Sequence, residues 1–192
     1  MKRKNVFLFV GILALIIVVT DNSTSILKFF YPVKFKDEVF GYSRQYGIDP
    51  YLVLAIMKAE SSFNPKAVSR RNAKGLMQIT DKTGEWAAFE IKLANYKNSD
   101  LFNPDTNIHI GCWYLRWLID NLKDVDLAIA AYNGGIGNVM EWLNDKNLSS
   151  TGFILDKIPF KETERYVVKV KNYYYVYKKL YQNQAAIGSC GY

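Results

Sequence analysis

Residues 50–60 restrict the fold more than any other segment, because they are apolar on nearly every side of a helix. Asp49 is a strong N-cap residue and Pro50 suits the first helical position, so a helix begins here. Asn64-Pro65 marks its exit. A helix without a polar face must be enclosed by other elements. The rest of the chain must therefore supply the helices that surround it.

Further helix patterns follow along the chain, and no series of alternating strands accompanies them. Asn103-Pro104 begins a helix whose apolar residues recur every three or four positions, Cys112 among them. Asp126 is expected to cap the next helix, and residues 66–82 are rich in turn residues. Helices are predicted at 35–46, 50–62, 104–122, 126–133, 137–143 and 161–182. The sequence predicts a mainly α protein with a single domain at 35–185 and a tail at 186–192.

The N-terminus has the pattern of an export signal. Lys2, Arg3 and Lys4 precede an apolar run from Val6 to Val19. The run is shorter than the roughly 20 residues of a full membrane span, and no A-x-A cleavage site follows it. An uncleaved signal anchor at 1–25 with a linker at 26–34 is favoured over a cleaved signal peptide. Either would place the domain outside the cytoplasm, held at the cell membrane or secreted.

Composition excludes several classes of partner. The formal net charge is +7, which suits an anionic wall polymer or lipid surface, but no cluster of basic residues with aromatics indicates nucleic acid. One histidine, His109, and two cysteines without metal-ligand spacing predict no metal site and no cofactor. Cys112 is expected in the core, and its pairing with Cys190 is left open.

Glu60 is the anomalous residue of the apolar helix. A carboxylate in its last turn would lose hydration, which raises its pKa and favours the neutral acid. A neutral carboxylic acid near neutral pH is what general-acid catalysis needs. A glutamate at a helix end that merely faces solvent or pairs with a base is the alternative.

Several short motifs occur in order after Glu60: Glu60-Ser61, Asn64-Pro65, Ser69, Gly75-Leu76-Met77-Gln78, Asn107-Ile108, Gly111, Tyr114-Leu115, Ala131-Tyr132-Asn133 and Ile158-Pro159-Phe160-Lys161-Glu162-Thr163. Their combination resembles the catalytic domain of the soluble lytic transglycosylases, a family related to goose-type lysozyme. The resemblance covers roughly residues 36–182 and implies a lysozyme-like fold. Asp81 and Thr83-Gly84 depart from the family pattern. The resemblance therefore does not fix the conformation of this loop or the preference of the sugar subsites.

The resemblance implies a role for each matching residue. Glu60 matches the catalytic acid/base, and Tyr132 matches a tyrosine held close to it. The other matching residues are implied to bind or line the substrate groove: Ser69, Met77, Gln78, Asn133, Glu162 and Tyr166.

The resemblance also implies a reaction without water. Glu60 would protonate the glycosidic oxygen between N-acetylmuramic acid and N-acetylglucosamine, then take the proton of the muramyl 6-hydroxyl as a 1,6-anhydro ring closes. A muramidase-type hydrolase is the alternative, with Glu85, Glu90 or Glu162 as the second carboxylate. An inactive wall-binding module and a structural helical domain are two further alternatives. We expect a monomer that acts on peptidoglycan glycan strands, with partners from the cell wall or a secretion machinery.

Overall fold

The computed structural model describes residues 25–188, with side chains described as far as residue 182. The chain divides into two compact units. Lys34–Tyr175 forms one, and the segments up to Val33 and from Val176 form the other. The domain bounds expected from the sequence, 35–185, stay a prediction.

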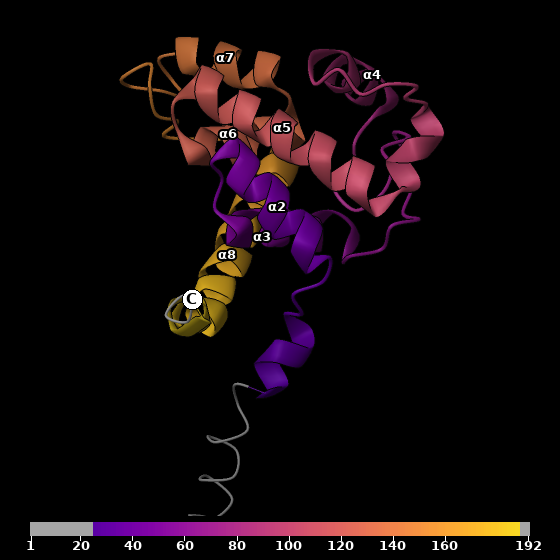
Figure 1. Cartoon of the computed structure of the whole chain (residues 1–192). Helices are drawn as coiled ribbons and strands as arrows, with labels where there is room; N and C mark the ends of the chain where they lie inside the picture. Colours follow the sequence, from indigo (N-terminus) through magenta and orange to yellow (C-terminus); the bar gives the residue numbers. More distant parts are fainter. Residues whose placement is uncertain (1–24, 189–192) are drawn as a thin grey trace, which may run out of the picture. The chain divides into compact units, whose positions relative to one another are not determined.

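The described chain is mainly helical, as predicted (Figure 1). β-pairing among the described residues is limited to two isolated bridges, Val68 with Lys74 and Lys74 with Ile79. The helices are α2 (Lys36–Tyr46), α3 (Pro50–Ser61), α4 (Asp81–Glu90), the 3₁₀ helix η1 (Asn98–Phe102), α5 (Pro104–Leu122), α6 (Val125–Gly134), α7 (Ile136–Asn144) and α8 (Lys161–Gly188).

Helix α3 is the buried helix that its composition predicted. Every residue from Tyr51 to Met57 is buried. Asp49 caps the helix, since its Oδ1 accepts a hydrogen bond from the Tyr51 amide at 2.9 Å. Helix α2 packs against both α3 and α5. The burial of apolar surface stabilises a fold by about 25 cal/mol per Å². The burial of α3 therefore stabilises the larger unit and fixes the position of its last turn, which contains Glu60.

Helix α5 is the longest element that lies wholly within the larger unit, and it contacts α2, α4, α6 and η1 (Figure 1). Asn103 caps it by accepting a hydrogen bond from the Thr106 amide. Cys112 is fully buried in its apolar stripe, as expected, whereas Cys190 lies outside the described residues. The stripe orients α5 so that Asn107, one position before the buried Ile108, also points inward.

Two local predictions were wrong. The turn-rich segment ends at Thr80, which caps the helix α4 that the sequence did not predict as an element. Glu85 and Glu90 are exposed on this helix, consistent with solvated charges. The cap of helix α6 lies two residues earlier than expected, because Asp124 rather than Asp126 accepts a hydrogen bond from the Leu127 amide at 2.8 Å.

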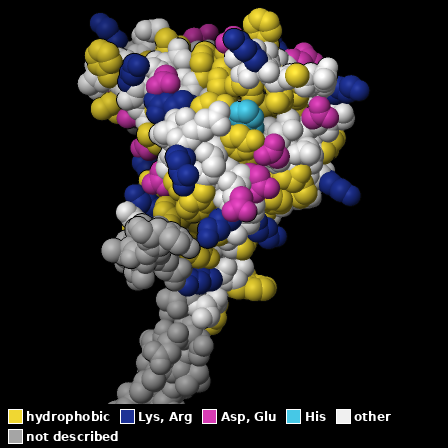
Figure 2. Space-filling model, viewed as in Figure 1, with side chains coloured by type: hydrophobic (Ala, Val, Ile, Leu, Met, Phe, Trp, Pro, Cys, Tyr) yellow, Lys and Arg dark blue, Asp and Glu magenta, His cyan; other side chains and the backbone are white. Residues whose placement is uncertain are grey.

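His109, the chain's one histidine (cyan in Figure 2), is partly exposed, with hydrophobic side chains around it and acidic ones close by on the same face. Its ring stacks on Tyr42 with centroids 4.3 Å apart, and Nε2 lies 2.7 Å from the Tyr46 hydroxyl oxygen. Burial between these rings lowers its pKa. His109 therefore joins α5 to α2, away from the cavities described below.

In the smaller unit, the end of α8 and the segment before Lys34 are joined by tyrosines. The Tyr177 hydroxyl donates to the Pro32 carbonyl at 3.1 Å, and the Tyr181 hydroxyl donates to the Tyr31 carbonyl at 2.7 Å. The apolar run from Val6 to Val19 lies outside the described residues. Among residues 25–188, no helix has the length and apolar content needed to cross a bilayer.

Candidate active site

Glu60 lies in the last turn of α3, where two cavities of about 520 Å³ each meet at its side chain. Ser62 ends the helix in the left-handed region at φ 51°. The Glu60 side chain is half-buried. The carboxyl group is thus held by a rigid, enclosed helix and still reaches the space in which a ligand could lie.

The pKa of Glu60 is raised from 4.5 to about 7, chiefly because burial penalises the carboxylate. Two groups act in the opposite direction. The Tyr166 hydroxyl of α8 donates a 2.6 Å hydrogen bond to Glu60 Oε1, and the charge of Lys169 also favours the carboxylate. Glu60 is consequently poised between its acid and its base form near neutral pH, which suits proton transfer in both directions.

Tyr132, the residue implied to lie close to the carboxylate, borders the same cavity as Glu60. Its hydroxyl donates to the Met77 carbonyl at 2.9 Å rather than to Glu60. Burial and the nearby Glu60 charge both raise the pKa of the Tyr132 phenol, so it stays neutral. The direct hydrogen-bond partner of Glu60 is therefore Tyr166.

Met77 differs from the expectation that its side chain lines the groove. The side chain is fully buried, and it packs so closely on α5 that a Cβ at Gly111 would lie 2.3 Å from its sulfur. Met77 reaches the site through its backbone carbonyl, which holds Tyr132 in place.

The loop of residues 66–80 is pinned to α5 by the buried Asn107. Asn107 Oδ1 accepts from the Met77 amide at 2.8 Å, while Nδ2 donates to the carbonyls of Lys74 and Leu101 at 2.9 and 2.8 Å. Gly75 is required at its position: its φ is +75°, and a Cβ there would lie 2.2 Å from the Leu101 oxygen. This loop therefore has one fixed path past Glu60.

Ser69 and Gln78 line the cavity from this loop. Ser69 Oγ accepts from the amides of Arg71 and Ala73. Gln78 has a φ of 49° and donates through Nε2 to the Gly75 carbonyl at 2.9 Å and the Ala67 carbonyl at 3.2 Å. Hydrogen bonds to the backbone orient both side chains. Both also line the cavity, where their other hydrogen-bonding atoms can meet a ligand.

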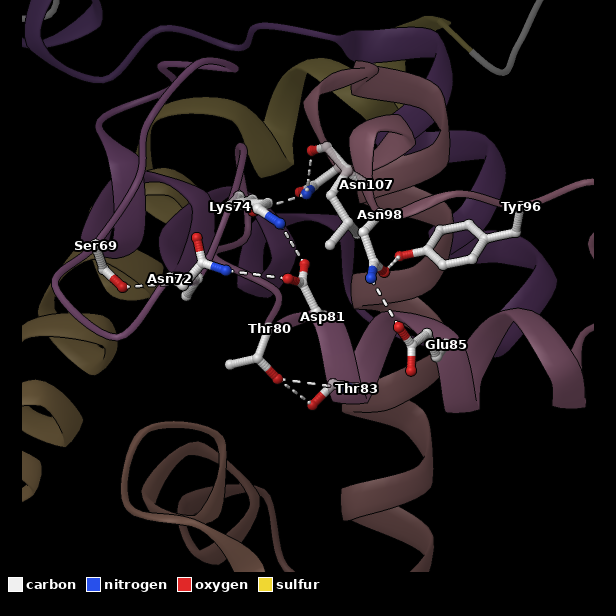
Figure 3. Close-up of polar contacts among 12 residues, drawn as sticks. Ser69, Asn72, Lys74, Thr80, Asp81, Thr83, Glu85, Tyr96, Asn98 and Asn107 are labelled. Carbon is white, nitrogen blue, oxygen red and sulfur yellow. Dashed lines mark hydrogen bonds and ion pairs between the residues drawn. The ribbon is translucent and has the colours of Figure 1, made fainter.

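A network of charged and amide side chains braces the same loop against the start of α4 (Figure 3). Asp81 accepts from Asn72 Nδ2 at 3.0 Å and forms an ion pair with Lys74. Asp81 is one of the departures from the family pattern, and these contacts give it a hydrogen-bond partner and an ion-pair partner within the fold. It ties the middle of the loop to the first turn of α4, where the loop ends.

The opposite wall comes from α6 and α8. Asn133 and Glu162 both border the cavities on the two sides of Glu60. Asn133 Oδ1 accepts from the buried Thr163 hydroxyl at 2.8 Å, and Gly134 allows this approach, since a Cβ there would lie 3.1 Å from Thr163 Oγ1. Glu162 is exposed.

The structure therefore brings Glu60, Ser69, Gln78, Tyr132, Asn133, Glu162 and Tyr166 to one continuous groove. It also adds residues that the sequence did not single out for the site. Asn107 belongs to the Asn107-Ile108 motif of the sequence analysis, but no role in the site was given to it there. The basic residues that border the groove carried no recognisable pattern: Arg70, Arg71, Arg165 and Lys169. Residues 25–188 contain no group of acidic, histidine or cysteine side chains placed to hold a metal ion.

Comparison with known proteins agrees with this arrangement. A family model described as the transglycosylase SLT domain matches residues 38–151, more than half of the chain. The chain belongs to this family, and its mainly helical fold is the lysozyme-like fold of that domain.

Individual relatives carry the same family name. The chain is 38% identical over 169 residues to the membrane-bound lytic murein transglycosylase C of Edwardsiella ictaluri, covering 77% of this chain and 47% of that protein. The 70 kDa soluble lytic transglycosylase of Escherichia coli is 32% identical with a TM-score of 0.72, over 80% of this chain and 25% of that one.

The lytic transglycosylase Slt of Pseudomonas aeruginosa, solved as an inactive mutant with glutamine in place of a glutamate, is 28% identical with a TM-score of 0.71. The match again covers 80% of this chain and 25% of that one. The chain thus spans about half the length of the curated relative and a quarter of these solved structures.

Proposed function

We propose that this chain is a peptidoglycan lytic transglycosylase with Glu60 as its single acid/base. The observation that carries the proposal is the position of Glu60: its pKa is about 7, and it stands where two cavities meet. A glycan strand threaded through both cavities would pass the carboxyl group. The relatives named as lytic transglycosylases support the same activity, and one of them is inactive with a glutamate changed to glutamine.

The first half of the reaction uses Glu60 as an acid. The protonated carboxyl gives its proton to the glycosidic oxygen between N-acetylmuramic acid and N-acetylglucosamine, and the C1–O bond breaks. The acetamido carbonyl of the substrate stabilises the positive charge at C1. Tyr166 then donates its 2.6 Å hydrogen bond to the carboxylate that remains, which lowers the energy of the charged form.

The second half uses the same group as a base. The Glu60 carboxylate takes the proton of the muramyl 6-hydroxyl while that oxygen forms a bond to C1. A 1,6-anhydro ring results, Glu60 is protonated again, and no water is consumed. One carboxyl group can serve both steps because its pKa is near the working pH.

The position of the other acidic residues supports a single carboxylate. Glu85 and Glu90 are exposed on α4 and border none of the cavities that Glu60 lines. Glu162 borders both cavities, and its exposure leaves it in water, where a substrate-binding role suits it.

We further propose that residues 1–25 anchor the chain in the cell membrane, with the domain on the extracytoplasmic side where peptidoglycan lies. The basic residues before the apolar run and the relative named as membrane-bound support this topology.

Glu60→Gln tests the activity. The substitution keeps the size of the side chain and removes the transferable proton, so cleavage of purified peptidoglycan should fall by about 10²–10⁴-fold. Circular dichroism and thermal unfolding should show an intact fold. Full lytic activity of this variant in a zymogram would eliminate Glu60 as the acid.

Mass spectrometry of the wild-type products tests whether the muramyl 6-hydroxyl or water attacks C1. We expect 1,6-anhydromuramic ends. Reducible muramic ends alone would establish a hydrolase, and Glu162→Gln would then show whether Glu162 is the second carboxylate.

A further inference from the structure

Residues 25–30 form a helical segment of the smaller unit. Its apolar side chains are exposed to solvent: the exposed fractions of Ile26, Leu27, Phe29 and Phe30 are 52%, 41%, 80% and 59%. The rings of Phe29 and Phe30 meet edge to face with centroids 5.4 Å apart, so they form one surface. We refer to these four side chains as the apolar face. An exposed surface of this kind indicates a contact site.

The apolar face is one side of the helical segment. Its four positions follow the helical spacings of three and four residues, whereas Lys28 lies on the opposite side. Lys28 Nζ is directed over the Tyr181 ring, 5.7 Å from its centroid. The polar side of the segment therefore packs on the aromatic residues of its own unit, and the apolar side faces outward. This is the reverse of the arrangement that a water-exposed amphipathic helix adopts.

Tyrosines of α8 hold the apolar face in place. Tyr177 is fully buried, packs edge-on against Tyr31 with centroids 5.5 Å apart, and stacks on Tyr181 at 6.1 Å. The Tyr31 amide donates to the Leu27 carbonyl at 2.8 Å, and the Tyr31 carbonyl accepts from the Tyr181 hydroxyl. The segment is thus a built part of the smaller unit, and its outward apolar surface is part of that built structure.

The charge of the smaller unit indicates what the apolar face contacts. In residues 22–33 and 176–192 the charged side chains of the sequence are Lys28, Lys178 and Lys179, and no aspartate or glutamate occurs there. Lys179 is exposed. Exposed aliphatic and aromatic side chains combined with lysines and tyrosines are typical of the boundary between lipid headgroups and acyl chains. The uniform positive charge suits anionic headgroups.

We propose that the apolar face inserts into the headgroup region of an anionic lipid bilayer, with Lys28 and Lys179 next to the lipid phosphates. This inference rests on the proposed anchoring of residues 1–25. The apolar run of that anchor ends at Val19, a short distance along the chain from the apolar face. The segment 26–34 is then part of the membrane contact as well as a linker.

The depth of a spin label at position 29 tests the inference in the full-length chain. A nitroxide is attached to Phe29→Cys in a Cys190→Ser background, because Cys112 is fully buried and should not react. In vesicles that contain phosphatidylglycerol, the label should be accessible to oxygen and shielded from a water-soluble nickel reagent. It should lie about 5–10 Å below the phosphates. Phe89→Cys on α4 is the matched control, since Phe89 is 81% exposed, and its label should stay in water.

The double variant Lys28→Gln/Lys179→Gln tests the choice of an anionic surface. In phosphatidylglycerol vesicles, the ratio of inserted to water-exposed label should fall by about 5-fold for each lysine removed. In vesicles of phosphatidylcholine alone, the ratio should be the same with and without the two substitutions, which separates charge from packing. Lys146→Gln in the larger unit is the control, because Lys146 is exposed, and it should leave the ratio unchanged. An unchanged ratio in the double variant would overturn the assignment to an anionic lipid surface.

Flotation of the full-length chain with vesicles separates this inference from the proposed anchor. A chain that floats while its label at position 29 stays in water would overturn the inference and leave the anchor standing. Strong spin–spin broadening between labels on neighbouring molecules would also overturn it, since the apolar face would then contact a second copy. A chain that does not float would refute the anchor, and the inference that rests on it would fall as well.

Discussion

Replacing Tyr166 with phenylalanine should move the pH dependence of catalysis upward. The Tyr166 hydroxyl donates a 2.6 Å hydrogen bond to Glu60 Oε1 and so stabilises the carboxylate form. Burial acts in the opposite direction and is the larger effect, which leaves the pKa at about 7. Tyr166→Phe keeps the ring in its buried position and removes only this donor. The carboxylate then becomes harder to form, and the pKa of Glu60 rises.

The size of the shift follows from the strength of the bond. A hydrogen bond to a charged group contributes about 1.5–3 kcal/mol net, and one pKa unit corresponds to about 1.36 kcal/mol. Tyr166→Phe should therefore raise the pKa of Glu60 by about 1 to 2 units. Because Glu60 must be protonated to begin the reaction, activity falls as the pH rises through its pKa. The alkaline limb of the profile should move to higher pH by the same amount.

The assay is kcat/KM for soluble glycan strands between pH 5 and pH 10, since this ratio reports the ionisations of the free enzyme. Tyr132→Phe is the matched control, because the Tyr132 hydroxyl donates to the Met77 carbonyl and not to Glu60. Its alkaline limb should stay near that of the wild type, whatever its rate. An unmoved limb in Tyr166→Phe, or one displaced to lower pH, would refute the assignment of this hydrogen bond to the carboxylate.

Two further predictions concern stability. The folded-state pKa of Glu60 is about 7, against 4.5 for a freely exposed glutamate carboxyl, so its contribution to stability is complete below about pH 4.5 and is lost as the pH rises through 7. The wild type should lose up to about 3 kcal/mol of unfolding free energy across this window relative to Glu60→Gln, and urea titrations at both ends measure it. Asn107→Ala should lower the free energy of unfolding by about 3 kcal/mol or more, because the Met77 amide and two carbonyls lose their partner inside the core. A loss below about 1 kcal/mol would mean that the loop is held by other contacts.

The burial of Glu60 could be predicted because its cause is local. The apolar residues that make α3 a buried helix lie in α3 itself, and a raised pKa was expected from that pattern alone. The hydrogen bond from Tyr166 could not be predicted in this way, because it depends on where α8 passes the end of α3. The resemblance placed Tyr166 in the substrate groove and Tyr132 close to the carboxylate, and neither statement fixed which hydroxyl donates to it.

Helix α4 was missed for a physical reason. Its first residues are polar and include Gly84, which is typical of a turn. The structure shows that Gly84 is needed there, since a Cβ would lie 2.1 Å from the Tyr96 hydroxyl oxygen. The Thr80 cap and the burial of Ala87 and Ala88 then stabilise the helix. A close approach between two segments made the glycine necessary, and a single sequence does not reveal such an approach.

The attachment of the loop to Asn107 has a consequence for the entropy of binding. Gln78 occupies a left-handed backbone conformation and uses its amide nitrogen on two carbonyls of its own loop. The conformational freedom of this segment is therefore given up when the chain folds, not when a strand arrives. A ligand that contacts Gln78 meets a surface that already has its bound conformation. Binding should therefore avoid the conformational-entropy cost of ordering a mobile loop.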